Sequence, residues 1–184
     1  MCIRDSTQGL IHVGKTHGVA MQIATAVEKV NDEQKHVLVH RVTSRFGKDL
    51  KGRRFALWGL AFKPRTDDVR EAPALTLISR LVEAGAEVRA HDPAARATAR
   101  AALGPVADKV IFVDHPYDAT VGADALVLVT EWQEYRSPDF ERLRAQMRQR
   151  VLLDGRNIWA ALDPEGHGFV YEGIGLGPRP GRAA

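Results

Sequence analysis

The fold is decided by the stretch Trp58-Gly-Leu-Ala-Phe-Lys-Pro-Arg-Thr-Asp-Asp-Val-Arg-Glu-Ala-Pro73. It begins at the end of an apolar run, Phe55-Ala-Leu-Trp58, which predicts a buried strand. After it, an amphipathic segment from Ala74 to Ala84 predicts a helix. A strand, a turn and a helix form the opening of an α/β unit. In such units ligands bind outside the carboxyl ends of the strands, so we expect a site at the loop in this stretch.

This loop carries cations where a dinucleotide-binding turn carries glycines. The dinucleotide fingerprint needs Gly-x-Gly-x-x-Gly so that the backbone can approach a pyrophosphate, and Gly59-Leu-Ala-Phe-Lys-Pro64 lacks it. The loop offers instead a point charge on Lys63, a planar fork on Arg70 and an aromatic face on Phe62. Lysine and arginine are the usual partners of phosphate. The alternative is that Arg70 only ties the loop down by pairing with a nearby carboxylate, at Asp67, Asp68 or Glu71.

The composition is that of a soluble globular protein with one ordinary domain and an extension. The chain has 184 residues, of which 45% are hydrophobic and 27% are charged. A formal net charge of +3 is too small to predict a nucleic-acid or membrane-surface partner, and no apolar run is as long as a membrane span. Since Cys2 is the only cysteine, there is no disulfide framework, and we expect a cytoplasmic protein.

Short apolar runs alternate with helical patterns from residue 54 onward. This alternation predicts an α/β fold, a Rossmann-like three-layer domain with a mainly parallel sheet. The predicted strands are 54–60, 87–91, 110–113, 125–130, 151–153 and 169–172, and the predicted helices are 73–84, 94–103, 117–121 and 138–149. The run 125–130 is apolar at five of six positions, as expected for a central strand.

The first part of the chain has helical periodicity and no predicted strand. A short helix is predicted over Thr7–Lys15, and a long one over Ala20–Phe46 has apolar residues on more than one face. At about 1.5 Å per residue the long helix would run roughly 40 Å. A helix of that length usually braces a neighbouring domain or a second subunit, so we expect a homodimer through residues 20–46. The alternative is a helix packed only on its own domain.

The expected organisation has four parts. Met1-Cys-Ile-Arg-Asp-Ser6 fits nothing that follows, and we interpret it as a non-native scar joined to a truncated reading frame. Residues 7–47 form a central helical dimerisation segment, and residues 48–175 form the α/β domain. Residues 176–184, rich in glycine and proline, form a mobile tail.

A second constellation, Leu153-Asp-Gly-Arg-Asn157, leaves a strand at the same edge of the sheet. If all strands run parallel, Arg156 points toward the loop that carries Lys63. Two cations at neighbouring strand ends favour an anion as the ligand. The alternative is a turn built by Asp154 and Gly155, with Arg156 in solvent.

Three further features are weaker. Trp132 could cover a base or a sugar, but a tryptophan at such a position more often caps the core, and we favour packing. Asp92 ends the second strand, where a Rossmann domain recognises a ribose, yet Asp92-Pro93 is equally a turn. His36 and His40 are one helical turn apart and lack a third ligand, so no metal site is predicted.

These motifs, taken in order, resemble one family. Gly59–Pro73 is similar to the signature of the UDP-glucose/GDP-mannose dehydrogenase family, in its C-terminal, UDP-binding domain. Three more segments match that family in the same order: Val27-Glu-Lys-Val-Asn-Asp-Glu-Gln-Lys35, Thr130-Glu-Trp132 and Asp154-Gly-Arg-Asn157. The last two look most like UDP-glucose 6-dehydrogenases. UDP-N-acetylmannosamine and GDP-mannose dehydrogenases are alternatives, as is a non-catalytic nucleotide-sugar-binding or dimerisation module.

The resemblance implies an activity and a set of roles. Members oxidise the C6 alcohol of a nucleotide sugar to a carboxylate in two steps with two NAD, in polysaccharide biosynthesis, and a central helix forms the dimer core. Carried over by motif, Lys63 and Arg156 contact UDP-glucose or a similar nucleotide sugar, and Phe62 lies beside it. Arg70 reaches across the interdomain cleft toward the phosphates of NAD.

The departure from the family lies at the N-terminus. The NAD-binding domain with its glycine fingerprint is missing, so we expect most of the cofactor site to be absent and the chain alone to be inactive. The family's catalytic segment Cys-Phe-Pro-Lys-Asp directly precedes the helix that begins here at Thr7, which puts Cys2 in register with the nucleophile. Since Ile3-Arg-Asp-Ser6 does not match that segment, no catalytic residue is assigned.

Overall fold

The computed structural model of the protein describes residues 3–176, and side chains from residue 7 onward. Its internal contacts divide the chain into two compact units, Met1–Val37 and Leu38–Ala184. Cys2 and nearly all of the tail expected over residues 176–184 lie outside the described residues.

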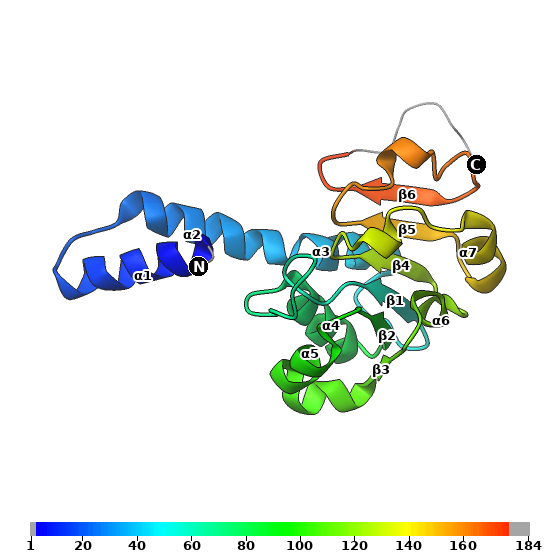
Figure 1. The fold of residues 1–184 in the computed structure, drawn as a ribbon, viewed down its shortest axis with the longest axis horizontal. Coiled ribbons are helices and arrows are strands. Elements are labelled where there is room, and N and C mark those ends of the chain that lie inside the picture. The colour runs from blue at the N-terminus through cyan, green and yellow to red at the C-terminus, as the bar shows by residue number, and fades with distance from the viewer. Residues whose placement is uncertain (1–2, 177–184) are drawn as a thin grey trace. The chain divides into compact units, whose positions relative to one another are not determined.

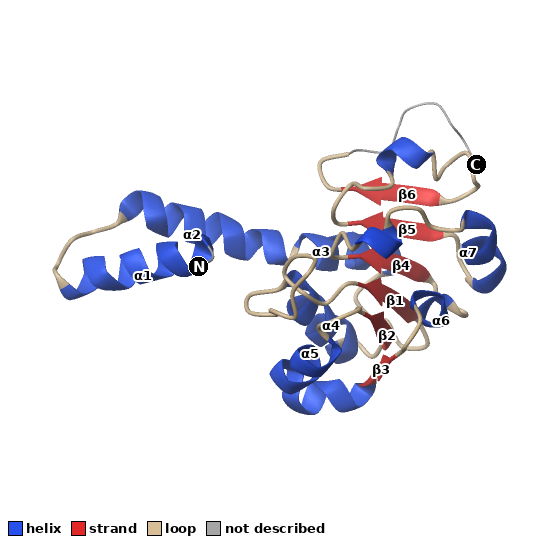
Figure 2. Cartoon of the chain, viewed as in Figure 1, coloured by secondary structure: helices blue, strands red, loops and turns tan. Residues whose placement is uncertain are grey.

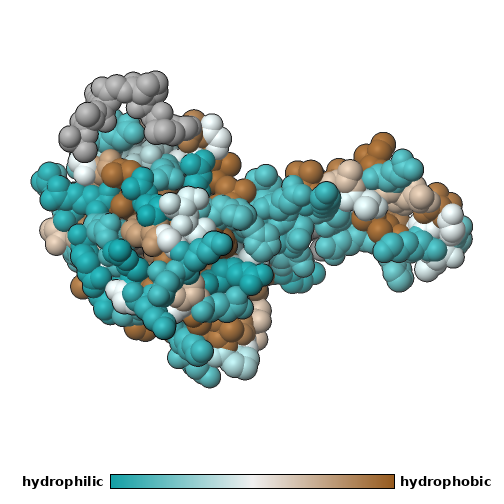
Figure 3. All heavy atoms as spheres, turned by 180° about the vertical axis from the view of Figure 1, so that it is seen from behind, coloured by the Kyte–Doolittle hydropathy of each residue, from teal (hydrophilic) through white to brown (hydrophobic). Residues whose placement is uncertain are grey.

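The described part of the first unit is a pair of helices, α1 (Ile3–Thr16) and α2 (Gln22–Lys35), which lie side by side (Figure 1). The hydroxyl of Thr7 on α1 donates to Oε1 of Glu28 on α2 over 2.7 Å. Every residue of α2 is described, and none is buried. Hydrophobic residues lie on the surface of this pair in the view of Figure 3. The exposed large apolar side chains between residues 7 and 35 are Leu10, Val13, Val19, Ile23, Val27 and Val30.

The single helix predicted over Ala20–Phe46 is wrong, because the structure has two helices there, α2 and α3 (Val37–Phe46). At the junction the amide of His36 donates to the carbonyl of Glu33, three residues back, which tightens one turn. The two helices also differ in burial. Leu38 and Val42 of α3 lie in the core of the second unit, whereas α2 buries nothing.

The second unit is built on a sheet that has six strands in the described residues, in the order β3-β2-β1-β4-β5-β6 (Figure 2). All neighbouring strands are parallel, so the predicted α/β class and parallel sheet are confirmed. The strands are β1 (Arg54–Trp58), β2 (Glu87–His91), β3 (Val110–Phe112), β4 (Ala125–Leu128), β5 (Val151–Asp154) and β6 (Val170–Gly173). Chain order reverses between β1 and β4, which is where ligands bind in open α/β sheets.

Helices cover both faces of this sheet, so the predicted three layers are confirmed (Figure 1). On one face, α3, α4 (Pro73–Glu83) and α5 (Arg96–Leu103) enclose the larger core cluster. On the other, α6 (Pro116–Thr120) and α7 (Phe140–Gln146) enclose a cluster in which Trp58 stacks on Tyr135 with ring centroids 5.0 Å apart. Short 3₁₀ segments lie at Gly104–Lys109, Gln133–Tyr135 and Ala160–Leu162.

Two strands each end two residues earlier than predicted. β1 ends at Trp58 and β4 at Leu128, each two residues before the predicted boundary. Gly59 turns the chain after β1 with a φ of 97°. The residues that the loops gain in this way are the ones that build the site described below.

Candidate functional site

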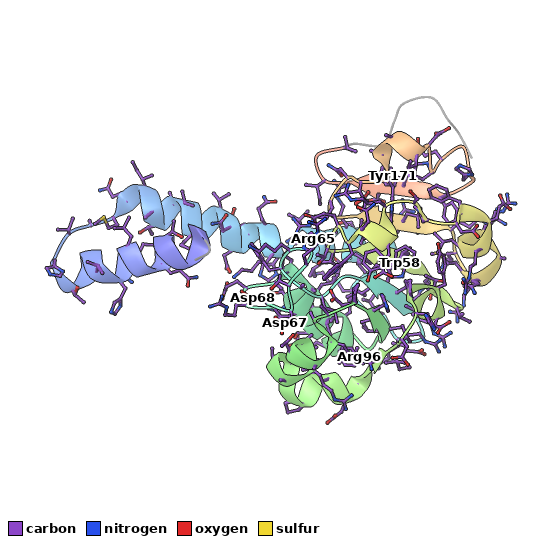
Figure 4. All side chains as sticks on the ribbon, viewed as in Figure 1. Trp58, Arg65, Asp67, Asp68, Arg96 and Tyr171 are labelled. Atoms are coloured by element: carbon purple, nitrogen blue, oxygen red, sulfur yellow. The ribbon has the colours of Figure 1, made fainter. Side chains whose placement is uncertain are left out.

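The carboxyl ends of β1, β4 and β5 are adjacent in the sheet, and three loops leave from them. The loop after β1, residues 59–72, is the longest. In Figure 4, Trp58 marks the strand from which it leaves, and Arg65, Asp67 and Asp68 mark its outer part. The other two are the loop after β4, residues 129–132, and the turn after β5, residues 155–157. The three motifs that the sequence singled out therefore meet at one edge of the sheet.

The β1 loop and the β4 loop touch at Gly59 and Thr130. A Cβ built on Gly59 would lie 2.5 Å from Cβ and 2.6 Å from the backbone nitrogen of Thr130, so only glycine fits there. The positive φ of Gly59 requires glycine for a second, independent reason. The Thr130 hydroxyl donates to the carbonyl of Ala61 over 2.5 Å. The close approach of the two loops is thus fixed by a hydrogen bond.

Asp92, at the end of β2, holds the same turn from the opposite side. Its buried Oδ2 accepts the amides of Leu60 (2.7 Å) and Ala61 (3.0 Å) and the indole N–H of Trp132 (3.0 Å). Its Oδ1 accepts the amides of the two residues that precede α5. Asp92 is therefore the organiser of two turns, and Trp132 packs against the core as favoured from the sequence.

This arrangement does not fit a dinucleotide in the Rossmann manner. The first three amides after β1 would face a pyrophosphate, but here they are used inside the protein. The amide of Gly59 donates to the carbonyl of His91, and those of Leu60 and Ala61 donate to the carboxylate of Asp92. Both oxygens of Asp92 are occupied by donors, so the carboxylate is not available to a ribose. Together with the single glycine of the turn, this shows that the β1 turn lacks the Rossmann arrangement for a pyrophosphate.

Arg156 reaches the β1 loop, as its position in the sequence predicts. Its Nε donates to the carbonyl of Val129 and its Nη2 to the carbonyl of Phe62, both over 2.9 Å. Oε2 of Glu131 lies 2.8 Å from the same Nε, at the distance of an ion pair but without the geometry of a hydrogen bond. The buried Asp154 accepts the amide of Arg156 and so builds the predicted turn. The side chain of Arg156 remains 33% exposed, but these hydrogen bonds hold its guanidinium against the loops after β1 and β4.

Lys63 follows this fixed turn and is exposed. Within the described part of the chain its ammonium has no hydrogen bond and no ion pair. The preceding residue, Phe62, is half-buried against the larger core cluster, and its amide donates to the carbonyl of Asp68 over 2.9 Å. The loop is thus closed at its base and presents Lys63 to solvent.

Arg70, farther along the loop, pairs with a carboxylate, which is the alternative that the sequence left open. Its Nη2 lies 2.7 Å from Oδ2 of Asp68, and its Nε donates to Oδ1 over 3.0 Å. The hydrogen bonds from Arg70 lower the pKa of Asp68 to about 2. The Arg70 side chain remains 70% exposed, so the pair lies at the surface.

Sequence reasoning missed His91, which is buried at the end of β2. Its Nδ1 lies 2.7 Å from the hydroxyl of Tyr135, and its Nε2 lies 3.2 Å from the carbonyl of Asp114. Burial lowers the pKa of this imidazole and so keeps it neutral. A polar cavity of about 330 Å³ lies beside it, and Arg96, labelled in Figure 4, lines the cavity with Asp114. Only a strand-end position marks His91 in the sequence.

Two features are not found among the residues that the structure describes. None of their histidine, cysteine, aspartate and glutamate side chains form a group of three that could hold a metal ion. Among the same residues, no helix has both the length and the apolar character needed to cross a membrane.

Comparison with known proteins decides the family. The sequence profile of the UDP binding domain of the UDP-glucose/GDP-mannose dehydrogenase family matches residues 56–161. The chain belongs to this family. The resemblance drawn from the motifs is therefore confirmed.

Relatives of this dehydrogenase family match nearly the whole chain. A UDP-glucose 6-dehydrogenase of Pseudomonas aeruginosa is 46% identical over 98% of the chain. A UDP-glucose dehydrogenase structure from Pyrobaculum islandicum is similar with a TM-score of 0.78 and 34% identity over 96% of the chain and 37% of its own. A UDP-D-ManNAc dehydrogenase structure from Pyrococcus horikoshii is similar with a TM-score of 0.59 and 28% identity, over 84% of the chain and 33% of its own. The chain spans 40% of the length of the Pseudomonas relative.

Proposed function

We propose that this chain supplies the nucleotide-sugar-binding part of a UDP-glucose 6-dehydrogenase. The whole enzyme would oxidise the C6 alcohol of UDP-glucose to the carboxylate in two NAD-dependent steps, giving UDP-glucuronate. The identity of 46% to a relative of that name supports this activity over others of the family. A cytoplasmic location and a role in polysaccharide biosynthesis belong to the same proposal.

The observation that carries the proposal is the exposed ammonium of Lys63, held at the switch point of the sheet. A diphosphate attracts such a point charge, and the rigid base of the loop fixes where the charge is presented. Arg156 adds donors, because no partner lies at its Nη1 within the described residues. Phe62 precedes Lys63, and its carbonyl accepts a hydrogen bond from Arg156. Its half-buried ring offers an apolar surface beside the nucleotide sugar.

We assign one residue of this chain, Arg70, to the binding of the cofactor. NAD would supply the hydride acceptor, and the β1 turn of this α/β unit lacks the Rossmann arrangement for its pyrophosphate. We assign Arg70 to its phosphates, since the exposed guanidinium has planar fork geometry and already holds a carboxylate. In this role the phosphates replace Asp68 as the partner of Arg70.

We assign the helical pair, α1 and α2, to the interface of a homodimer. The dimerisation segment was expected over residues 7–47, and α3 is committed to the core of the α/β unit. The surface proposed for a second copy therefore narrows to α1 and α2, whose apolar side chains are exposed, Ile23 by 83%. Sedimentation equilibrium tests this, with a dimer expected for the chain and a monomer for Ile23→Asp. A monomeric unsubstituted chain would contradict it.

Calorimetric titration of UDP-glucose into the purified chain tests the substrate site. We expect binding, and we expect Lys63→Ala to cost about 1.5–3 kcal/mol, roughly tenfold to a hundredfold in Kd, as one charge-assisted hydrogen bond is lost. Lys109→Ala is the matched control, since Lys109 is also exposed but precedes β3, at the opposite edge of the sheet. Tighter binding of UDP-N-acetylmannosamine or GDP-mannose would assign the chain to those dehydrogenases. No binding of any of the three at millimolar concentration, by a folded chain, would reject the nucleotide-sugar site.

A further inference from the structure

The tripeptide Thr130-Glu-Trp132 surrounds the turn that precedes Lys63. We propose that its three side chains are positioning residues, which fix the backbone of residues 59–62 and so hold Lys63 in place for the diphosphate of the nucleotide sugar. The inference rests on the proposed function and deepens it, because it assigns a role at the same site to residues that need not touch the ligand.

Thr130 acts on the turn directly. Its hydroxyl binds the Ala61 carbonyl over 2.5 Å, and its backbone nitrogen occupies the space next to Gly59 that any Cβ would need. The amides of Val129 and Thr130 also donate to the carbonyl of Trp58, at 2.9 and 3.4 Å. The start of the β4 loop is therefore hydrogen-bonded to the end of β1, and the Thr130 hydroxyl adds a hydrogen bond to the turn that follows β1.

Trp132 acts through Asp92. The indole N–H is the third donor to the oxygen that also accepts the amides of Leu60 and Ala61. A carboxylate oxygen held by three donors has little freedom to move. Trp132 is in addition packed against both core clusters, which anchors the indole itself. The indole thus fixes the position of the carboxylate, and the carboxylate fixes two consecutive amides of the turn.

Glu131 acts through Arg156. Its carboxylate lies 2.8 Å from Nε of Arg156, and Nη2 of the same guanidinium donates to the carbonyl of Phe62. The carbonyl that Arg156 holds is the one bonded to the nitrogen of Lys63. Glu131 also compensates part of the charge of Arg156.

The three routes converge on four main-chain groups of the turn: the amides of Leu60 and Ala61 and the carbonyls of Ala61 and Phe62. Packing alone does not require this pattern, because an ordinary loop leaves many such groups to water. Fixing a loop before the ligand arrives removes an ordering cost from binding. Lys63 is the first residue after the fixed segment, and its side chain is exposed and has no ion pair within the described part of the chain.

Two substitutions that do not change charge test the inference. Thr130→Val removes the hydroxyl and keeps the shape, and Trp132→Phe removes the indole N–H. We expect each to weaken the binding of UDP-glucose, measured by calorimetry, by about threefold to tenfold. Thr120→Val is the matched control, because Thr120 is a buried threonine on α6 whose hydroxyl binds the Tyr117 carbonyl over 2.8 Å, and it should leave the Kd unchanged.

The readout that separates positioning from general stability is the dependence on Lys63. In a Lys63→Ala background, Thr130→Val and Trp132→Phe should produce no further loss of affinity. An equal loss in both backgrounds, or none in the unsubstituted background, would overturn the inference and leave the proposed function intact. A folded unsubstituted chain that does not bind UDP-glucose would overturn both. Thermal unfolding is used to confirm that each variant is folded. If Trp132→Phe does not fold, Thr130→Val alone is used for the test.

Discussion

Asp92 gives the sharpest test of how the site is built, through the substitution Asp92→Asn. The carboxylate accepts three donors at Oδ2 and two at Oδ1. An amide has one oxygen, so its best orientation keeps that oxygen at the Oδ2 position and turns its NH₂ toward the two amides before α5. Two hydrogen bonds to a charged acceptor are then lost in a buried place. At about 1.5–3 kcal/mol each, the free energy of unfolding should fall by roughly 3–6 kcal/mol.

Urea unfolding followed by tryptophan fluorescence measures this change. The chain has three tryptophans, and Trp58, Trp132 and Trp159 all lie in the α/β unit, so their fluorescence reports that unit. Asp114→Asn is the control, because Asp114 is 79% exposed and pairs only at the surface with Arg96, and it should cost less than about 1 kcal/mol. A loss for Asp92→Asn no larger than that of Asp114→Asn would refute the claim that this carboxylate organises the edge of the sheet.

Three further predictions concern single residues of the same edge. Gly59→Ala should lower the free energy of unfolding by about 2–4 kcal/mol, since a clash with Thr130 adds to the strained φ. Gly47→Ala is the control, because Gly47 has a positive φ but open space around it, and it should cost about 1 kcal/mol. Equal costs for the two substitutions would contradict the clash at Gly59. Burial lowers the pKa of His91, so the unfolded chain binds the proton more readily and stability should fall as the pH drops from about 7 to 5. His91→Gln should flatten that slope in urea titrations, and an unchanged slope would count against it. Arg70→Ala should raise the pKa of Asp68 from about 2 toward 3.8, followed by carboxyl NMR, and a pKa that stays near 2 would show that Arg70 is not the cause. Because the lowered pKa of Asp68 stabilises the fold above its ordinary pKa, that contribution is lost as the pH falls through about 2.

The fold could be predicted from the sequence because its signals are local and repeated. Runs such as Ala125–Leu128, buried on both faces, and the helices between them leave few alternatives to a parallel sheet. The break at His36 could not be predicted, since no glycine or proline stands there and the apolar periodicity continues through it. The two helices differ in burial, because α3 buries Leu38 and Val42 whereas α2 buries nothing, and this difference arises only in the folded protein.

The position of the site at the carboxyl ends of the strands could be predicted from the sequence. Most of the contacts that build the site could not. Lys63 and Arg156 were identified from cations after strand ends, and Arg156 does reach the loop that carries Lys63. Glu131 was not singled out, because its partner Arg156 lies 25 residues later and on another strand. The role of Asp92 likewise depends on amides of a loop some thirty residues earlier, a relation that only the folded sheet creates. Contact of Phe62, Lys63, Arg156 and Arg70 with ligands remains a prediction.

The central claim is that this α/β unit binds a nucleotide sugar at the carboxyl ends of β1, β4 and β5. Amide NMR spectra of the chain, recorded while UDP-glucose is added, test it most directly. We expect shifts concentrated at residues 60–65 and 155–157, and we expect these shifts to be lost in Lys63→Ala. Saturable shifts centred instead on the cavity beside His91, or none at millimolar UDP-glucose, would contradict it.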